Sequence, residues 1–343
     1  MTESQVIVVS PPGSGTPLLA DLTSALGYLS YGSMSATPVV GGGSAGTPEI
    51  VAMRPLLTAA HGPDEAELLL KRGGEERGVL EAAFREAAGA LWRVWWMRLG
   101  QPVAVASSVD PGLESRLARV EERELPGLLP GRGCWYVEGL DLQRADAGFL
   151  RTWQKSGRPP IVFHHRDVRD RIVSQIRSLA RPDTPDGHRP HQLIYRDIVA
   201  ALPTMDAKIT FALTDPGFPG MEEARRCQWL LHHPAVTVIT HEDLAGPAHG
   251  GTAEGRERAV ARLLAITGLP PSAAAAAASA QPPREDEELM VGQWRSCFTP
   301  AHERLLDRRH GDLLTTRAEM RPAGGPTTGP TTETAREPGT TAR

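Results

Sequence analysis

A glycine-rich turn near the N-terminus has the composition of a phosphate-binding loop. Residues 11–17 read Pro-Pro-Gly-Ser-Gly-Thr-Pro and follow an apolar run, Val6–Val9. Leucines at helical spacing come next, and Pro17 suits the first turn of a helix. Strand, turn and helix in this order direct backbone N–H groups and the positive end of a helix toward an anion. The expected contacts to the anion come from Gly13, Ser14, Gly15, Thr16 and Pro17.

The turn alone leaves two interpretations open. Glycine and proline also occur where a chain turns from strand to helix without binding any ligand. The phosphate-binding loop of kinases and ATPases places Lys and then Ser or Thr after its last glycine. Here Gly15 is followed by Thr16 and Pro17, so the lysine that would reach the terminal phosphates is absent.

A second basic motif follows another apolar run. The run Ile161–His165 leads into Arg-Asp-Val-Arg-Asp-Arg-Ile-Val-Ser, residues 166–174. Arginine supplies a permanent charge and a rigid fork of donors that suits phosphate. Together the two motifs indicate a nucleotide with phosphates at two ends.

With these two motifs the chain resembles the sulfotransferases that use 3′-phosphoadenosine 5′-phosphosulfate (PAPS). The first motif of that family, Pro-Lys-Ser-Gly-Thr-Thr, aligns with residues 12–17 and implies that they hold the 5′-phosphosulfate. The second motif begins with Arg and has Ser eight residues later. Arg166 and Ser174 have this spacing, and the family uses these positions on the 3′-phosphate; Val168 replaces the usual proline.

Two later segments extend the resemblance. Val236–Leu244 is similar to the family's strand that ends in Tyr-Glu-Asp-Leu, with His241 at the tyrosine position. Gly292–Pro300 is similar to the Gly-Asp-Trp…Phe-Thr segment near the family's C-terminus. The four segments occur in the family's order, from about Val6 to Leu314.

Two positions depart from the family pattern. Gly13 stands where the family has the lysine that contacts the sulfuryl group and its leaving phosphate, so another cation must compensate, the donor differs, or activity is lost. The whole chain contains three lysines, Lys71, Lys155 and Lys208. The family also has an arginine five residues before the glycine that corresponds to Gly292. Glu287 stands there, and Arg284, about one helical turn earlier, is the expected substitute in the donor site.

The catalytic base is expected near the end of the strand within Cys134–Leu140. Gly139 stands where many relatives have a histidine, and its neighbour Glu138 is the candidate base because some carbohydrate sulfotransferases use Glu. Glu138 has a second interpretation, as a strand-end cap or the partner of an arginine. His165 is the next candidate, with His164 beside it, and successive strand residues face opposite sides, so one of the two at most faces the cleft.

The alternation of elements predicts an α/β fold with a central parallel sheet flanked by helices, and the resemblance implies a P-loop-like sulfotransferase fold. Further strands are expected at Val103–Ala106, Trp135–Val137, Ile161–Phe163, Ile209–Phe211 and Val236–Ile239. Residues 1–322 are expected to form one domain, with a flexible loop at 31–60, a helical insertion at 61–100, and a connector at 270–283. Residues 323–343 are expected to form a disordered tail.

Tryptophans recur at helical spacing within the expected helical insertion. Trp92, Trp95 and Trp96 share one helix face with Leu99. Such a stripe most often packs a helix against a sheet. The alternative is an aromatic wall for the pocket that accepts the sulfuryl group.

Composition limits the partners. The net charge of the 343-residue chain is −4, which argues against a general nucleic-acid binder. Three cysteines without metal-ligand or disulfide spacing favour a reducing cytoplasm, and no metal cofactor, signal peptide or membrane-length apolar run is expected.

The resemblance therefore implies sulfuryl transfer from PAPS to a hydroxyl or amine of a small molecule. The bias toward Arg, Ala, Gly and Pro with few lysines is typical of a high-GC coding source, and a bacterial source of that kind would favour a secondary metabolite as the acceptor. A P-loop nucleotide or small-molecule kinase using ATP and Mg²⁺, and a non-catalytic PAPS-binding protein, are the alternatives. The oligomeric state stays open.

Overall fold

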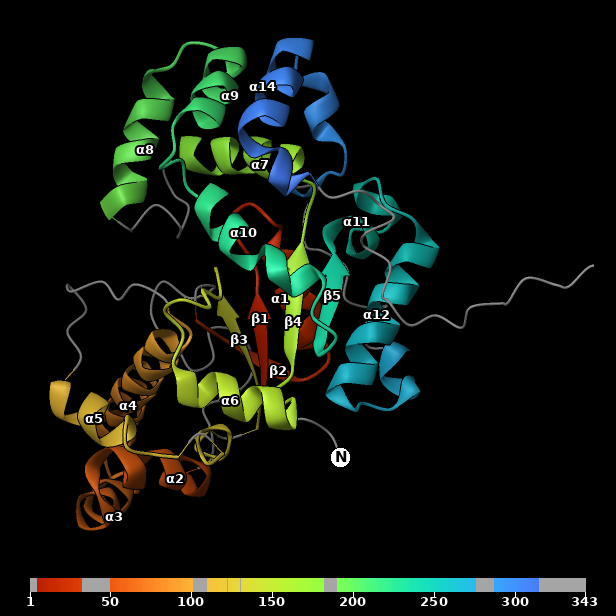
Figure 1. The fold of residues 1–343 in the computed structure, drawn as a ribbon. Coiled ribbons are helices and arrows are strands. Elements are labelled where there is room, and N and C mark those ends of the chain that lie inside the picture. The colour runs from red at the N-terminus through yellow and green to blue at the C-terminus, as the bar shows by residue number, and fades with distance from the viewer. Residues whose placement is uncertain are drawn as a thin grey trace, which may run out of the picture.

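Five parallel strands form the centre of the molecule (Figure 1). The computed structural model describes residues 5–32, 50–100, 110–121, 123–129, 131–181, 190–275 and 287–314. The strands are β1 (Gln5–Val9), β2 (Tyr28–Gly32), β3 (Arg132–Val137), β4 (Ile161–His165) and β5 (Val236–Thr240). Their order is β2-β3-β1-β4-β5, and every neighbouring pair is parallel. The predicted α/β class with a central parallel sheet is confirmed.

The apolar runs of the sequence form strands because helices cover both faces of the sheet. Val6 and Val8 of β1 join one apolar cluster with helices α1 (Thr16–Ala25) and α12 (Ala253–Thr267). Ile7 and Val9 join the opposite cluster, which includes α6 (Ala147–Ser156). Alternate residues of one strand therefore hold two separate layers of helices in place.

The chain reverses its direction of travel across the sheet between β1 and β4. From β1 it proceeds through α1 to the edge strand β2, whereas from β4 it proceeds to the opposite edge strand β5. β1 and β4 nevertheless lie side by side. In open α/β sheets the crevice outside the carboxyl ends of two such strands is the usual place for a ligand.

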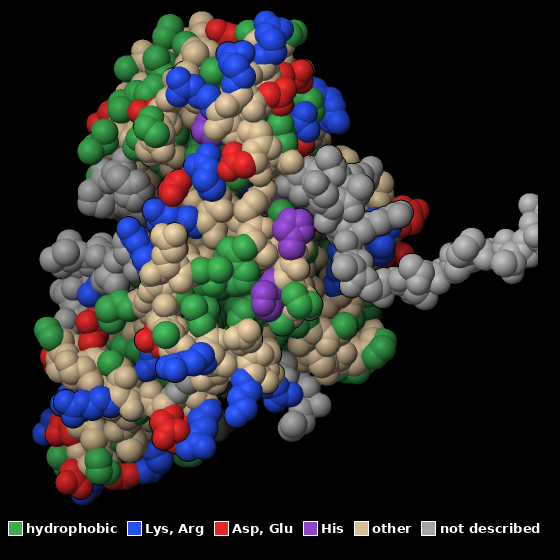
Figure 2. Space-filling model, in the orientation of Figure 1, with side chains coloured by type: hydrophobic (Ala, Val, Ile, Leu, Met, Phe, Trp, Pro, Cys, Tyr) green, Lys and Arg blue, Asp and Glu red, His purple; other side chains and the backbone are tan. Residues whose placement is uncertain are grey.

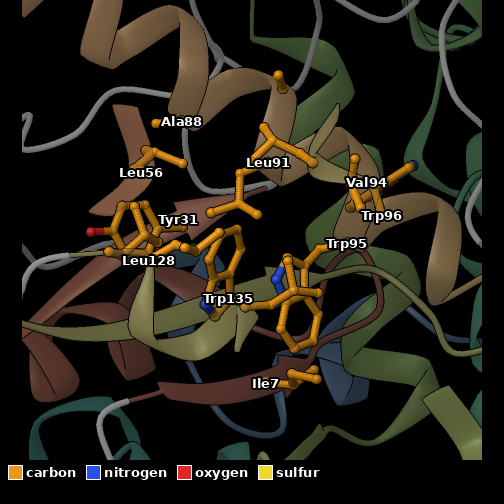
Figure 3. Close-up of a cluster of buried hydrophobic side chains, with 14 of the residues drawn as sticks. Ile7, Tyr31, Leu56, Ala88, Leu91, Val94, Trp95, Trp96, Leu128 and Trp135 are labelled. Carbon is orange, nitrogen blue, oxygen red and sulfur yellow. The ribbon is translucent and has the colours of Figure 1, made fainter. Parts of the chain in front are cut away.

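A helical layer packs beside β3. It comprises α2 (Ile50–His61), α3 (Pro63–Arg72), α4 (Arg77–Arg98) and α5 (Pro111–Leu117). Trp92 and Trp95 of α4 each stack on Trp135 of β3 with ring centroids 5.6 Å apart (Figure 3). Trp95 and Trp135 are fully buried, so the tryptophan stripe is part of the core.

The prediction of a loop at 31–60 is wrong at both ends of that range. β2 extends to Gly32, and residues 50–60 belong to α2. The helix forms because Met53, Leu56, Leu57 and Ala60 recur on one side and are buried against the neighbouring helices. Residues 33–49 lie outside the described part of the chain, as do the expected strand Val103–Ala106 and the tail at 323–343.

A second group of helices follows β4. It comprises α7 (Val168–Ala180), α8 (Pro190–Ala201), α9 (Met205–Thr214), α10 (Met221–Cys227) and α14 (Pro300–His310). The strand expected at Ile209–Phe211 is wrong, because these residues lie within α9. Ile209 and Leu213 share one face of that helix and are buried in a cluster with α7 and α14, so tertiary burial decides against a short apolar run that resembles a strand.

Short helices complete the described chain. They are α11 (His241–Leu244) and the single 3₁₀ turns η1 (Leu125–Gly127), η3 (Gln228–Leu231), η4 (Pro247–His249), η5 (Pro271–Ala273), η6 (Glu287–Leu289), η7 (Gln293–Ser296) and η8 (Gly311–Leu313). The predicted connector at 270–283 contains η5 near its start, and the structure describes it only to residue 275. No helix in the described ranges is long and apolar enough to cross a membrane.

Candidate functional site

The glycine-rich turn lies between the carboxyl end of β1 and the first residue of α1, as predicted. Gly13 and Gly15 have φ angles of 79° and 81°, a left-handed conformation that favours glycine. Ser14 between them is fully buried, and its hydroxyl has no hydrogen-bond partner within the described chain. Backbone N–H groups of this turn and of the first turn of α1 therefore lie beside a buried, unused hydroxyl, which suits an anion.

Arg166 is the buried cation at the centre of the site. Its side chain is fully buried and follows directly after β4. Nη1 donates to the Gly13 carbonyl at 3.1 Å, and Nη2 donates to the Met290 carbonyl at 2.9 Å. Nε is buried without a partner in the described residues. Burial lowers the pKa of Arg166, and the charges of Asp170 and Glu242 oppose that shift.

The segment that contains Met290 packs along α7. Asp170 accepts hydrogen bonds from Gly292 N at 2.6 Å and Trp294 N at 2.9 Å. The guanidinium of Arg169 lies 3.8 Å from the centre of the Trp294 ring. Ser174 is buried one helical turn after Asp170 on the same helix face. The fold therefore brings Ser174 and Arg166 to one side of the C-terminal segment, whereas Arg284 lies outside the described residues.

A line of buried polar side chains supports the turn from the α1 side of the sheet. The Ser10 hydroxyl lies 2.8 Å from the Thr16 hydroxyl and 3.1 Å from His164 Nδ1. His241 Nε2 donates to the Leu289 carbonyl at 2.8 Å. Burial and the Arg166 charge lower the pKa of both histidines, that of His164 to about 3, so both are neutral near pH 7.

His165 belongs to the opposite face of the sheet, as strand alternation requires. Its ring lies 5.7 Å from the ring of Phe163, and its Nε2 is buried without a partner among the described residues. Burial, followed by the charge of Arg171, lowers its pKa to about 4. His165 is therefore a neutral imidazole beside a buried cation at neutral pH.

Glu138 directly follows β3 and is half-buried. Ser10 N donates to the Val137 carbonyl at 2.8 Å, so the ends of β1 and β3 are joined just before the turn. Because all five strands are parallel, Glu138, His165 and residues 11–16 lie at the same edge of the sheet. The predicted base candidates and the predicted anion loop are thus brought to one edge.

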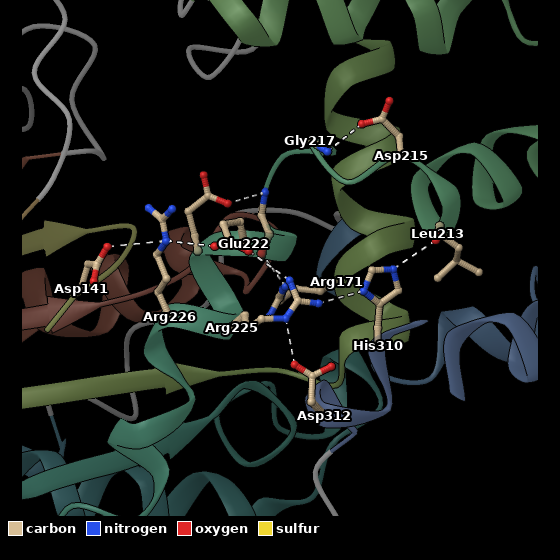
Figure 4. A network of polar contacts seen from close by, with 12 residues as sticks. Asp141, Arg171, Leu213, Asp215, Gly217, Glu222, Arg225, Arg226, His310 and Asp312 are labelled. Carbon is tan, nitrogen blue, oxygen red and sulfur yellow. Dashed lines mark hydrogen bonds and ion pairs between the residues drawn. The ribbon is translucent and has the colours of Figure 1, made fainter. Parts of the chain in front are cut away.

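Ion pairs hold helix α10 against neighbouring segments. Arg226 contacts Asp141 at 3.6 Å and Glu222 at 3.1 Å, while Arg225 contacts Asp312 at 2.9 Å (Figure 4). These ion pairs join α10 to the segment after β3 and to η8. In the orientation of Figure 1, hydrophobic side chains gather in the middle of the visible face beside histidine side chains, and charged side chains concentrate above and below them (Figure 2).

Sequence reasoning missed three contributors to the site. Ser10 and Gly220 carry no motif of their own, and Arg171 lies inside the second basic motif without having been singled out. The only sequence signal for Arg171 is that it is the third arginine of the motif at residues 166–174. Within the described ranges, no three His, Cys, Asp or Glu side chains are grouped so that they could hold a metal ion.

No protein-family model and no curated protein matches the chain. Among solved structures, it is similar to mouse sulfotransferase SULT7A1, crystallised in complex with PAP, at 14% sequence identity and a TM-score of 0.45. The match covers 89% of this chain and 83% of the mouse chain.

The buried histidines predict a loss of stability in acid. Unfolded histidine has a pKa of about 6.5, whereas folded His164 and His165 titrate at about 3 and about 4. Between these values the unfolded chain binds more protons, so their contribution is complete above about pH 7 and decreases as the pH falls toward 4. Each histidine should add up to about 1.4 kcal/mol per pH unit to the slope of unfolding free energy against pH.

Urea unfolding of His164→Asn and His165→Asn between pH 4 and 7 measures this slope. Each variant should show a shallower slope than the wild type. His232→Asn is the matched control, because His232 is exposed. A slope unchanged in both buried variants would contradict the proposed neutral state.

The geometry of the turn also predicts that Gly13 tolerates no side chain. A Cβ there would lie 2.6 Å from the Arg171 carbonyl oxygen, and φ is 79°. Gly13→Ala should therefore destabilise the protein by about 1–3 kcal/mol in urea unfolding. Gly78→Ala is the control, since Gly78 is exposed in α4 with open space around it, and it should stabilise by about 0.5–1 kcal/mol. A Gly13→Ala protein as stable as the wild type would refute the close approach.

Proposed function

We propose that this protein transfers a sulfuryl group from PAPS to a hydroxyl or amine of a small molecule. The observation that carries the proposal is the presence, at the carboxyl ends of the neighbouring strands β1 and β4, of two features whose chemistry suits anions. The turn at 11–16 begins α1, and Arg166 with Ser174 lies along the start of α7. A donor with phosphate groups at both ends fits this pair of features better than a nucleotide with one phosphate chain.

The 3′-phosphate is assigned to Arg166 and Ser174. Two of the five N–H donors of Arg166 are used by the Gly13 and Met290 carbonyls, and Nε is free among the described residues. A phosphate beside this guanidinium would gain a charge-assisted hydrogen bond and would balance a charge that is otherwise buried. The Ser174 hydroxyl adds a neutral donor.

The 5′-phosphosulfate is assigned to the turn at 11–16. In the reaction the acceptor oxygen or nitrogen forms a bond to sulfur, and the bond between sulfur and the 5′-phosphate oxygen breaks. The electron pair of that bond stays on the phosphate oxygen, and the product is PAP, the 3′,5′-bisphosphate. Donors that face this oxygen stabilise the charge that develops there.

The acceptor proton is assigned to the Glu138 carboxylate. Glu138 lies at the same edge of the sheet as the turn, and His165 is the alternative base on the other side of β1. The hydrophobic side chains gathered on this face beside α10 favour an acceptor with an apolar body (Figure 2). A secondary metabolite is one such acceptor.

The donor assignment predicts selectivity for the bisphosphate. PAP should bind at least about tenfold more tightly than AMP, because a charge-assisted phosphate contact contributes about 1.5–3 kcal/mol. Ser174→Ala should reduce this preference about two- to tenfold, since it removes one neutral donor. Isothermal titration calorimetry gives both affinities. Ser156→Ala, in an exposed serine of α6, should leave the preference unchanged. Equal affinity for PAP and AMP would refute the assignment and would favour the kinase alternative.

The base assignment predicts a loss of turnover without a loss of donor binding. Glu138→Gln keeps the size of the side chain and removes the proton acceptor, so the rate of PAP release should fall about 10²–10⁴-fold. The rate is measured with PAPS and a panel of phenol, alcohol and amine acceptors. Glu124→Gln, at an exposed glutamate before β3, is the control. Normal turnover in Glu138→Gln would move the base to His165, and PAP binding without turnover by the wild type would indicate a non-catalytic binder.

A further inference from the structure

Arg171 is a second buried cation at the glycine-rich turn, and nothing in the preceding assignment uses it. It lies one turn into α7, and its side chain is 4% exposed. Its carbonyl oxygen and its Cγ lie 2.6 and 3.2 Å from the position that a Cβ on Gly13 would occupy. The backbone carbonyl of Arg171, and next to it the start of its side chain, therefore occupy the space that a side chain at position 13 would need.

The guanidinium of Arg171 is directed toward Gly220, the residue before α10. Nη2 donates to the Gly220 carbonyl at 2.7 Å. Gly220 in turn lies against Pro12, since a Cβ on Gly220 would be 3.1 Å from the Pro12 carbonyl oxygen. Arg171 thus lies between Gly13 and Gly220, the residue that abuts Pro12.

The charge of Arg171 has no carboxylate partner within 4 Å in the described chain. The two carboxylates that favour its charged form have other partners: Glu223 accepts from Gly220 N at 3.0 Å, and Asp167 pairs with Arg169 at 2.6 Å. The neighbouring groups Arg166 and His165 supply a second cation and a neutral imidazole. A buried arginine with one carbonyl partner is costly unless an anion completes its environment.

We propose that Arg171 binds the sulfuryl or phosphoryl group at the 5′ end of the donor. This inference rests on the proposed function. Phosphate-binding turns ordinarily obtain their cation from a lysine on the turn itself. Here the cation comes from α7, and glycine stands at position 13 because its φ is positive and the backbone of Arg171 approaches it closely. Arg171 then stabilises the charge that develops on the 5′-phosphate oxygen as the bond to sulfur breaks.

The decisive comparison is between PAP and adenosine 3′-monophosphate, which lacks the 5′-phosphate. The ratio of their affinities measures what the protein gains from the 5′ group. Arg171→Gln keeps much of the stem and removes the charge, so it should reduce this ratio about 10- to 100-fold while the affinity for the 3′-monophosphate stays nearly constant. Arg177→Gln, further along the same helix, is the matched control and should leave the ratio unchanged.

Arg171→Lys provides a second test should the glutamine variant fail to fold. A buried lysine has a lowered pKa and can lose its proton at moderately alkaline pH. The affinity ratio in Arg171→Lys should therefore be nearly that of the wild type at pH 7 and should fall between pH 7 and 9, whereas the wild-type ratio should stay constant over that range, because burial lowers the pKa of Arg171 only to about 10.

The outcomes separate this inference from the proposed function. A wild-type protein that binds neither PAP nor the 3′-monophosphate refutes the proposed function. A wild type that prefers PAP, with the same ratio in Arg171→Gln, refutes the inference alone. If only the lysine variant folds, a ratio independent of pH up to 9 overturns the role of Arg171.

Discussion

The buried guanidinium of Arg166 holds together three segments that are far apart in the sequence. It joins the end of β4 to the carbonyl of Gly13 and to the carbonyl of Met290. Burying a charge is unfavourable, and here two carbonyl dipoles together with the charges of Asp170 and Glu242 offset the cost. Arg166 therefore links the glycine-rich turn directly to the C-terminal segment.

The neutral histidines belong to the same balance of charge. His164, His165 and His241 lie near Arg166 or Arg171, and burial next to a cation keeps them uncharged. Among the described residues, Arg166 and Arg171 therefore supply two buried positive charges at fixed places, to which these three histidines add none at neutral pH. A site of this kind favours one anionic ligand that spans both charges. The nearby carboxylates accept hydrogen bonds from the backbone. Asp170 accepts from two N–H groups, and one oxygen of Glu242 accepts from Asp167 N.

The sequence predicted those parts of the fold that depend on local pattern. The runs before residues 11 and 166 became β1 and β4 because each contains several consecutive apolar residues, as is usual for strands covered on both faces. Ile209–Phe211 became a helix, because burial against α7 and α14 depends on contacts that are distant in the sequence. The start of α2 was missed for a similar reason, since its apolar stripe follows a glycine-rich stretch that resembles a loop.

The candidate site was predicted in part. The turn, Arg166 and Ser174 belong to motifs that follow apolar runs in the sequence. The parallel sheet brings the carboxyl ends of the strands formed by these runs together. Arg171 and Gly220 could not be predicted, because their significance comes from a close approach between Gly13 and α7 that no spacing reveals. Arg284 lies outside the described residues and stays a prediction.

A crystal structure of the protein with bound PAP tests the central claim most directly. The account predicts the 3′-phosphate within hydrogen-bond distance of Arg166 Nε and the 5′-phosphate against the backbone N–H groups of residues 13–16. The bound nucleotide would then lie across the carboxyl ends of β1 and β4. A PAP molecule bound elsewhere on the protein, or one at this edge with neither phosphate contacting Arg166 or the turn, would contradict it.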